Sequence, residues 1–248
     1  MAKRILVTGA ASGIGAACAR RLARDGAGRL VLVDREPLDT DALGLAGRDC
    51  AVFRGDVADP ALWDEVEASA GPLDWAVLNA GIAAGGAIAD TGFDEWRRVL
   101  GINLDGAFLS LRSALRLAND GASIVLTASA SGFKAEPGTA AYGASKAGVI
   151  QLAKVAAKEG AARGIRVNAI APGGVDTPIW DQTPFFRDLV GQHGGDRDAA
   201  LAAMARMATP LGRYATSDEI AAQIAFLLSD DAATITGAVL VSDGGYSL

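Results

Sequence analysis

The sequence alternates short apolar runs with longer, alanine-rich stretches over almost its whole length. Seven apolar runs are strand candidates, at residues 4–8, 29–34, 51–54, 75–79, 123–128, 166–170 and 239–242. Several of them are apolar throughout rather than at every second residue, which is typical of strands buried on both faces. The helix candidates between them are residues 13–25, 60–69, 94–117, 140–163 and 217–228. This order predicts an α/β fold in which helices cover both faces of a doubly wound, parallel, seven-stranded sheet.

One stretch interrupts the alternation. Between residues 178 and 211 no strand candidate occurs, and aromatic residues and methionines are mixed with glycines. No linker or repeat divides the 248-residue chain, so we expect a single domain over residues 1–248. An excursion of this length in a compact domain is typical of a substrate-binding lid, and a helical hairpin packed on the core is the structural alternative.

Charge and hydropathy exclude two classes of partner. The chain has 23 Lys and Arg against 29 Asp and Glu, a net charge of −6, and no run of basic residues. A nucleic-acid-binding protein would normally present a basic face, so we expect no nucleic-acid partner. The longest useful apolar stretch without a charge, residues 75–89, is too short to span a membrane and contains glycines. We therefore expect no membrane partner.

The numbers of cysteines and histidines indicate whether the chain can hold a metal site or a disulfide framework. Two cysteines, Cys18 and Cys50, make no disulfide framework, and a single histidine, His193, makes no zinc cluster. We predict no metal site. The residues Met1-Ala2-Lys3-Arg4 lead straight into the first strand candidate, so we expect no signal peptide and a cytoplasmic protein.

A glycine-rich turn follows the first strand candidate and opens the first helix candidate. It reads Gly9-Ala10-Ala11-Ser12-Gly13-Ile14-Gly15, a spacing that differs from the general dinucleotide fingerprint G-x-G-x-x-G. The physical requirement is the same: the chain turns sharply, no Cβ blocks a pyrophosphate, and a helix N-terminus faces the anion. The turn predicts a dinucleotide site.

The second strand candidate ends at Asp34, nineteen residues after Gly15, where a ribose-binding acid is expected. A carboxylate there would accept hydrogen bonds from the adenosine ribose hydroxyls and repel a 2′-phosphate. Arg35 could grip such a phosphate, but the charge of Asp34 would lie directly against it. We therefore predict NAD as cofactor, with NADP less favoured.

Tyr142 and Lys146 lie four residues apart near the start of a helix candidate, and hence on one helix face. A tyrosine with a pKa near 10 is a poor base, and a nearby ammonium would favour its phenolate. Ser129 follows a strand candidate, at the carboxyl edge where doubly wound sheets bind ligands. Together with the nucleotide turn, these residues indicate proton exchange with an alcohol.

These residues form part of a longer series of motifs. The series comprises Thr8 to Gly15, Asp56-Val57, Asn79-Ala80-Gly81, Asn103 within Ile102-Asn103-Leu104-Asp105-Gly106, Ser129, Tyr142-Gly143-Ala144-Ser145-Lys146, Pro172-Gly173-Gly174-Val175-Asp176-Thr177-Pro178 and Asp243-Gly244-Gly245. With these motifs the chain resembles the short-chain dehydrogenase/reductase family, single-domain NAD(P)-dependent oxidoreductases with a Rossmann fold. The likeness runs nearly end to end, and Ser129 precedes Tyr142 by thirteen positions, as in the family.

The resemblance implies a role for each matching residue. Tyr142 would be the catalytic acid/base, Lys146 would lower its pKa and hold the nicotinamide ribose, and Ser129 would orient the substrate oxygen. Asn103 would anchor a water that connects Lys146 to solvent. The remaining cofactor contacts would come from Asp56, Val57, Asn79, Ala80, Gly81, Pro172, Gly173, Val175 and Thr177, of which Pro172, Gly173 and Thr177 would lie by the nicotinamide. The stretches 35–49 and 59–73 look shorter than is usual in the family, which implies trimmed peripheral helices.

The residues expected around the reacting carbon are small or apolar, which predicts a hydrophobic secondary alcohol or its ketone, aromatic ones included, as substrate. Ser131, Phe133, Trp180 and Phe185 are the candidate substrate residues, although aromatic residues in the 178–211 segment could equally pack it.

One alternative function is that of an NADPH-dependent 3-oxoacyl-thioester reductase, which Asp34 and the acidic net charge disfavour. Another is a non-catalytic nucleotide-binding sensor, which would have no use for the phenol of Tyr142. By resemblance, we expect a homotetramer assembled through residues 94–117, 140–163 and the C-terminal segment.

Overall fold

The computed structural model describes residues 3–248, without the side chains of Gln182 and Pro184; Met1 and Ala2, part of the expected strand-leading N-terminus, lie outside it. Its centre is a seven-stranded sheet in the order β3-β2-β1-β4-β5-β6-β9, with every neighbouring pair parallel. The strands are β1 (Arg4–Thr8), β2 (Arg29–Asp34), β3 (Cys50–Arg54), β4 (Leu73–Leu78), β5 (Ala118–Thr127), β6 (Arg166–Pro172) and β9 (Val239–Ser242). The predicted doubly wound parallel sheet is confirmed.

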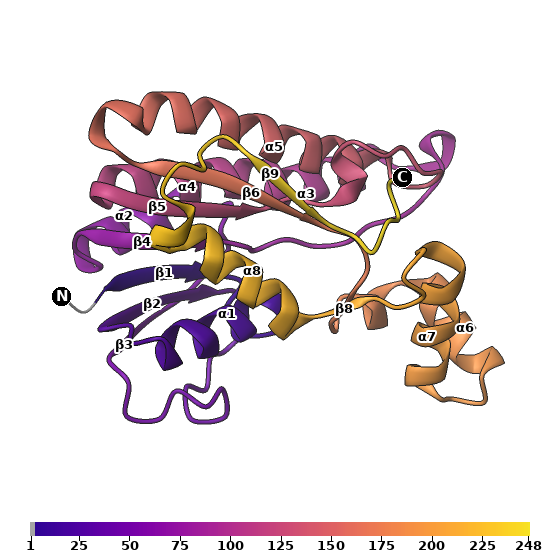
Figure 1. Cartoon of the computed structure of the whole chain (residues 1–248). Helices are drawn as coiled ribbons and strands as arrows, with labels where there is room; N and C mark the ends of the chain where they lie inside the picture. Colours follow the sequence, from indigo (N-terminus) through magenta and orange to yellow (C-terminus); the bar gives the residue numbers. More distant parts are fainter. Residues whose placement is uncertain (1–2) are drawn as a thin grey trace.

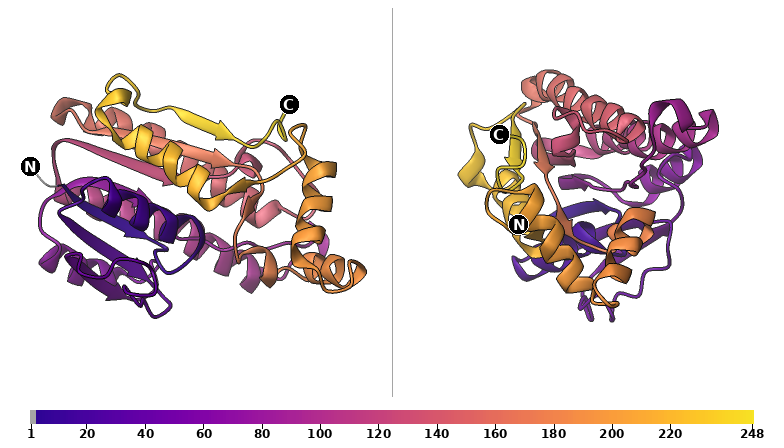
Figure 2. Two further views of the ribbon diagram at one scale, coloured as in Figure 1. Left: turned by 60° about the horizontal axis from the view of Figure 1, so that its bottom comes forward. Right: turned by 90° about the vertical axis from the view of Figure 1, so that its right-hand side faces the viewer.

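Two apolar clusters lie on opposite faces of this sheet, because successive side chains of a strand point to opposite sides. In β1, Leu6 joins one cluster, while Ile5 and Val7 join the other. Helices α2 (Pro60–Ser69), α4 (Gly106–Leu117) and α5 (Ala140–Gly160) cover the first face. Helices α1 (Gly13–Arg24) and α8 (Ser217–Leu228) cover the second, as Figures 1 and 2 show.

The predicted helix over residues 94–117 is wrong as a single element. The chain forms α3 (Phe93–Leu100), a π-helical turn (Gly101–Asp105) and then α4. The side chain of Asn103, inside the turn, is hydrogen-bonded to both main-chain groups of Ile82, a contact that sequence periodicity does not reveal. Such a π-turn inserted into an α-helix frequently marks a functional site.

Shorter elements complete the description. No helix occurs within residues 35–49, the crossover between β2 and β3, in agreement with the expected trimming there. Strand β5 begins five residues earlier than the apolar run, and a register irregularity separates its first pair from the rest. Besides the 3₁₀ turn of the 178–211 segment, 3₁₀ turns lie at Ile88–Asp90, Ala130–Gly132, Ala161–Arg163 and Asp230–Ala232. Among the described helices, none has the length and apolar character needed to cross a bilayer.

The 178–211 segment contains no strand, as expected, and forms two helices beyond the carboxyl end of the sheet (Figures 1 and 2). A 3₁₀ turn (Trp180–Gln182) leads into α6 (Pro184–Gln192), and α7 (Arg197–Ala208) follows. Strands β7 (Val175–Asp176) and β8 (Ala215–Thr216) pair in parallel at the base of the segment, a small sheet that the sequence did not indicate. The segment has a small apolar core of its own around Phe186 and Met204.

Candidate active site

The predicted site residues converge on one edge of the sheet. Many of them lie at or just after the carboxyl end of a strand: the glycine-rich turn follows β1, Asp34 ends β2, Asn79 follows β4 and Ser129 follows β5. Asn103 instead lies in the π-turn, and Tyr142 and Lys146 lie on α5. In a parallel sheet these ends lie side by side, so residues far apart in sequence meet at this edge. The helices α6 and α7 lie beyond the same edge (Figure 1).

The glycine-rich turn has the shape that its sequence predicts. Gly9 and Gly13 adopt positive φ angles of 67° and 53°, which glycine alone adopts without strain. A Cβ on Gly15 would lie 1.9 Å from the carbonyl oxygen of Gly9, so only glycine lets α1 begin directly against the turn. Ser12, the N-cap of α1, is exposed and makes no capping hydrogen bond. The positive end of α1 is thus open to an anion.

Asp34 lies beside this turn, half-buried at the end of β2. Its Oδ2 accepts a hydrogen bond from the Ala11 amide at 2.8 Å, and its Oδ1 accepts one from the Glu36 amide at 2.9 Å. Each carboxylate oxygen keeps a lone pair for a further donor. The guanidinium of Arg35 instead pairs with Glu36 at 3.2 Å and is exposed.

The other residues expected along the cofactor are placed around the same edge. Asp56 Oδ1 accepts a hydrogen bond from the Ala58 amide at 2.9 Å, and Val57 is buried. The amides of Asn79 and Ala80 both donate to Thr8 Oγ1, at 2.9 and 3.1 Å, which ties the end of β4 to the end of β1.

Tyr142, Lys146 and Ser129 form one group at the start of α5. The Lys146 ammonium lies 5.7 Å from the centroid of the Tyr142 ring. Burial raises the pKa of Tyr142, and a hydrogen bond with Ser129 opposes that rise. Burial lowers the pKa of Lys146 to about 8. The Ser129 hydroxyl also accepts a hydrogen bond from the Ser131 amide at 3.2 Å, which leaves its own proton for the Tyr142 oxygen.

The Lys146 side chain is 4% exposed yet only partly satisfied. Within residues 3–248 its sole hydrogen-bond acceptor is the Thr127 carbonyl, at 2.9 Å. Two of the three ammonium donors are therefore available to other groups. A Cβ on Gly81 would lie 3.3 Å from Nζ, so the glycine there keeps the approach to this ammonium open. The glycine-rich turn fits the phosphates of a dinucleotide, and the unused donors of Lys146 fit its ribose.

Asn103 is linked to Tyr142 through Ser145. Its Oδ1 accepts from the Ile82 amide at 2.8 Å, and its Nδ2 donates to the Ile82 carbonyl at 3.0 Å and to Ser145 Oγ at 3.2 Å. Ser145 Oγ in turn donates to the Tyr142 carbonyl at 2.7 Å. Both amide hydrogens are used, so a water at Asn103 would need the second Oδ1 lone pair or the main-chain carbonyl. The anchored water remains a prediction.

The segment after β6 approaches the glycine-rich turn. A Cβ on Gly13 would lie 3.3 Å from Thr177 Cγ2, so the Thr177 side chain rests against the turn. Pro172 and Val175 are buried, and a Cβ on Gly173 would lie 2.8 Å from Asp243 Cβ. The structure therefore brings Thr177 and the turn together from positions more than 160 residues apart.

The candidate substrate residues divide into two kinds. Phe133 and Phe185 are 49% and 64% exposed, and Ser131 is half-buried beside Ser129. Trp180 is packed: its Nε1 donates to the Val175 carbonyl at 2.8 Å, and its ring stacks on Tyr214 with centroids 5.7 Å apart. For Trp180 the packing interpretation has direct support, and its contact with substrate stays a prediction.

Sequence reasoning missed several residues at the site. Ser145 sits inside the Tyr142–Lys146 motif, and its bridging role depends on Asn103 from another element. An open apolar hollow of about 520 Å³ lies beside the start of α5 and is lined by Ile88, Thr91, Phe93, Trp96 and Ala140. The apolar residues between positions 88 and 96 were the available signal for this hollow.

Comparisons with known proteins agree with this geometry. A family model described as enoyl-(acyl carrier protein) reductase matches residues 9–247. The chain is 42% identical to the cis-4-hydroxycyclohexanecarboxylate dehydrogenase of Sinomonas cyclohexanicum, covering 98% of this chain and 95% of the relative. It is 35% identical to the NADP-dependent (R)-specific alcohol dehydrogenase of Lentilactobacillus kefiri, covering 99% and 96%. The crystal structure of levodione reductase superposes with a TM-score of 0.86 at 32% identity, covering 98% and 96%. The chain belongs to the short-chain dehydrogenase/reductase family of NAD(P)-dependent oxidoreductases.

Proposed function

We propose that the protein is an NAD-dependent dehydrogenase that interconverts hydrophobic secondary alcohols, aromatic ones included, and their ketones. The observation that carries the proposal is the group that buried Lys146 and Ser129 form with half-buried Tyr142 at the sheet edge that holds the glycine-rich turn. The two named relatives are dehydrogenases, one of a hydroxycyclohexane acid and one of alcohols, which supports the same reaction class.

The residues of the group have complementary roles. The Ser129 hydroxyl, hydrogen-bonded to Tyr142 in the structure, would turn its proton to the substrate oxygen and so orient the reacting carbon. Tyr142 takes the hydroxyl proton in oxidation and returns it in reduction. A protonated Lys146 nearby stabilises the phenolate against the burial that raises the pKa of Tyr142. The bound nicotinamide would accept or donate the hydride, and the unused donors of Lys146 would hold its ribose.

The choice of NAD rests on Asp34. Its carboxylate lies beside the glycine-rich turn with a lone pair left on each oxygen, which suits the two ribose hydroxyls. A 2′-phosphate there would meet a negative charge, and the guanidinium of the adjacent residue Arg35 is paired with Glu36. Cofactor choice varies within the family, since one relative is named as NADP-dependent.

The substrate class rests on the apolar surroundings. Exposed Phe133 and Phe185, with the apolar hollow beside α5, offer surface for a bulky hydrophobic group. The second candidate function is an NADPH-dependent 3-oxoacyl-thioester reductase, favoured by the acyl-carrier-protein description of the family model. The net charge of −6 opposes the acidic carrier that such an enzyme must dock.

The test offers purified protein NAD or NADP with a series of aromatic and aliphatic secondary alcohols, and follows formation of the reduced nicotinamide. We expect turnover with NAD on bulky alcohols. Turnover with NADP alone would favour the thioester reductase. The variant Tyr142→Phe should lower kcat by roughly 100- to 10,000-fold, because it removes the proton-transferring group, while cofactor binding persists. If neither protein turns over and both bind cofactor equally, a non-catalytic sensor becomes the better interpretation.

A further inference from the structure

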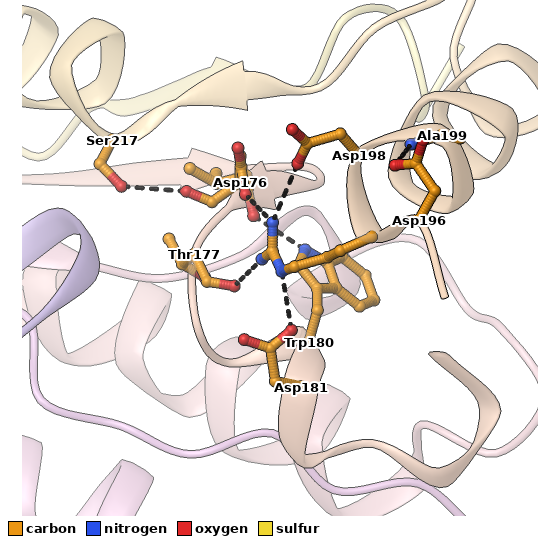
Figure 3. A network of polar contacts seen from close by, with 10 residues as sticks. Asp176, Thr177, Trp180, Asp181, Asp196, Asp198, Ala199 and Ser217 are labelled. Carbon is orange, nitrogen blue, oxygen red and sulfur yellow. Dashed lines mark hydrogen bonds and ion pairs between the residues drawn. The ribbon is translucent and has the colours of Figure 1, made fainter. Parts of the chain in front are cut away.

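A single arginine, Arg197, connects helix α7 with residues 176–181, where the chain enters the 178–211 segment. Arg197 is the first residue of α7, and Asp196 caps that helix by accepting from the Ala199 amide at 2.9 Å. The Arg197 guanidinium donates through Nε to Asp181 Oδ1 and through Nη1 to Asp176 Oδ1, both at 2.9 Å. Its Nη2 donates to the Thr177 carbonyl at 3.1 Å. Figure 3 shows Asp176, Thr177 and Asp181 arranged around these contacts.

The contacts join elements that are otherwise separate. Asp176 belongs to β7, Asp181 to the 3₁₀ turn, and the guanidinium also lies 5.7 Å from the ring centroid of Phe186 in α6. Ser217, at the start of α8, donates to the Asp176 carbonyl at 3.2 Å. The two carboxylate hydrogen bonds raise the pKa of Arg197, so it stays charged. Arginine suits this place because its rigid fork can satisfy several acceptors at once.

The position of Thr177 connects this cluster with the cofactor site. Its carbonyl is held by Arg197, while its side chain rests against Gly13 of the glycine-rich turn. Arg197 also pairs with Asp176 and Asp181, two carboxylates close in sequence to Thr177, and its positive charge offsets one of their two negative charges. Without the guanidinium, both negative charges would stand uncompensated in a segment that would face an anionic dinucleotide.

We propose that Arg197 is a positioning residue that holds Thr177 at the glycine-rich turn and thereby sets the affinity for the nicotinamide half of the cofactor. It acts through Asp176, Asp181 and the Thr177 carbonyl, without contacting the cofactor itself. The inference rests on the proposed function, because it requires that a nicotinamide dinucleotide binds at the turn.

The experiment compares the binding of NADH with that of AMP, which lacks the nicotinamide half. Fluorescence titration of the full chain with NADH, and calorimetry with AMP, give the two Kd values. In Arg197→Gln we expect the NADH Kd to rise roughly 10-fold, a typical coupling between neighbouring sites, while the AMP Kd stays within about twofold. The KM for NAD should rise with the NADH Kd, and kcat should change less.

The matched control is Arg163→Gln. Arg163 also bridges segments, by donating to Asp120 Oδ1 at 2.9 Å and to the carbonyls of Leu115 and Ala118. It belongs to the 3₁₀ turn Ala161–Arg163 and contacts the first residues of β5, at the opposite end of the sheet from the site. We expect it to leave both Kd values unchanged.

Several outcomes would overturn the proposal. An unchanged NADH Kd in folded Arg197→Gln would do so, and an equal weakening of NADH and AMP would reduce Arg197 to a general structural role. If circular dichroism shows that this variant does not fold, Arg197→Lys, which keeps the positive charge and loses the fork that reaches the Thr177 carbonyl, should still weaken NADH selectively. Wild-type protein that binds AMP but not NADH would instead refute the proposed function, and the positioning role with it.

Discussion

At the residue scale, Lys146 carries an ammonium group in a buried position. Burial lowers its pKa from 10.5 to about 8, which corresponds to roughly 3 kcal/mol of unfavourable folding free energy while it is protonated. Because its pKa in the folded protein lies below that in the unfolded chain, the unfolded state binds more protons between about pH 8 and 10.5. The contribution of Lys146 to the free energy of unfolding therefore rises across that range and is lowest below pH 8.

We predict that Lys146→Met abolishes catalysis and yet raises the free energy of unfolding at pH 7, by up to roughly 3 kcal/mol. The gain should shrink as the pH rises toward 10, where the wild-type side chain also becomes neutral. Urea denaturation of both proteins at pH 7 and 9.5 measures this difference. A variant that is less stable than wild type at pH 7 would contradict the burial argument.

Asp34 makes a second prediction at this scale. Asp34→Ser removes the carboxylate from the place expected for the ribose, so kcat/KM with NAD should fall by roughly 10-fold or more, the usual cost of charged hydrogen bonds. Activity with NADP should rise, because the repulsion of a 2′-phosphate is gone. Kinetics with both cofactors check this. Asp39→Ser, the same charge change at a nearby exposed turn, is the control and should alter neither value.

At the element scale, some aromatic residues of the 178–211 segment pack its interior, and others are exposed and available to a substrate. Trp180 holds the segment together through its hydrogen bond to Val175 and its stack on Tyr214, whereas Phe185 is 64% exposed. Trp180→Ala should loosen the segment, because it removes these contacts; the cost for this half-buried side chain should lie below the roughly 3–5 kcal/mol of a fully buried tryptophan. Phe185→Ala should leave stability within about 0.5 kcal/mol and lower kcat/KM for bulky alcohols more than for small ones.

Limited proteolysis and a series of alcohols of increasing size measure these two effects. Faster cleavage between residues 178 and 211 is expected for Trp180→Ala alone. Unchanged substrate selectivity in Phe185→Ala would remove Phe185 from the substrate site and leave it as ordinary exposed surface.

At the scale of the whole molecule, exposed apolar side chains lie on the elements expected to form the assembly. Phe108 on α4, Val155 on α5 and Val241 on the edge strand β9 are 48%, 42% and 45% exposed. We predict a tetramer at micromolar concentration in sedimentation velocity. Phe108→Glu should shift the protein toward smaller species while its circular dichroism stays native, because a charge would be buried at the contact. A wild-type monomer would overturn the assembly prediction.

The sequence by itself determined the positions and the parallel direction of the main strands, because runs buried on both faces leave a pattern that needs no tertiary knowledge. It also determined which residues gather at the site. Residues that follow parallel strands must meet at the carboxyl edge, so Gly9, Asp34, Asn79 and Ser129 could be placed together from their positions alone. The spacing of Tyr142 and Lys146 likewise follows from helix geometry.

Only the tertiary structure decided the rest, because those features depend on contacts between distant residues. The side chain of Asn103, in the π-turn, is hydrogen-bonded to the main chain of Ile82. The sequence pattern does not show this contact, so it predicted one continuous helix there. Trp180 resembled a substrate residue until its partners Val175 and Tyr214 were known. Arg197 looked like any charged residue of a long excursion. Its importance lies in the hydrogen bonds that its guanidinium makes with Asp176, Thr177 and Asp181, contacts that exist only in the folded segment.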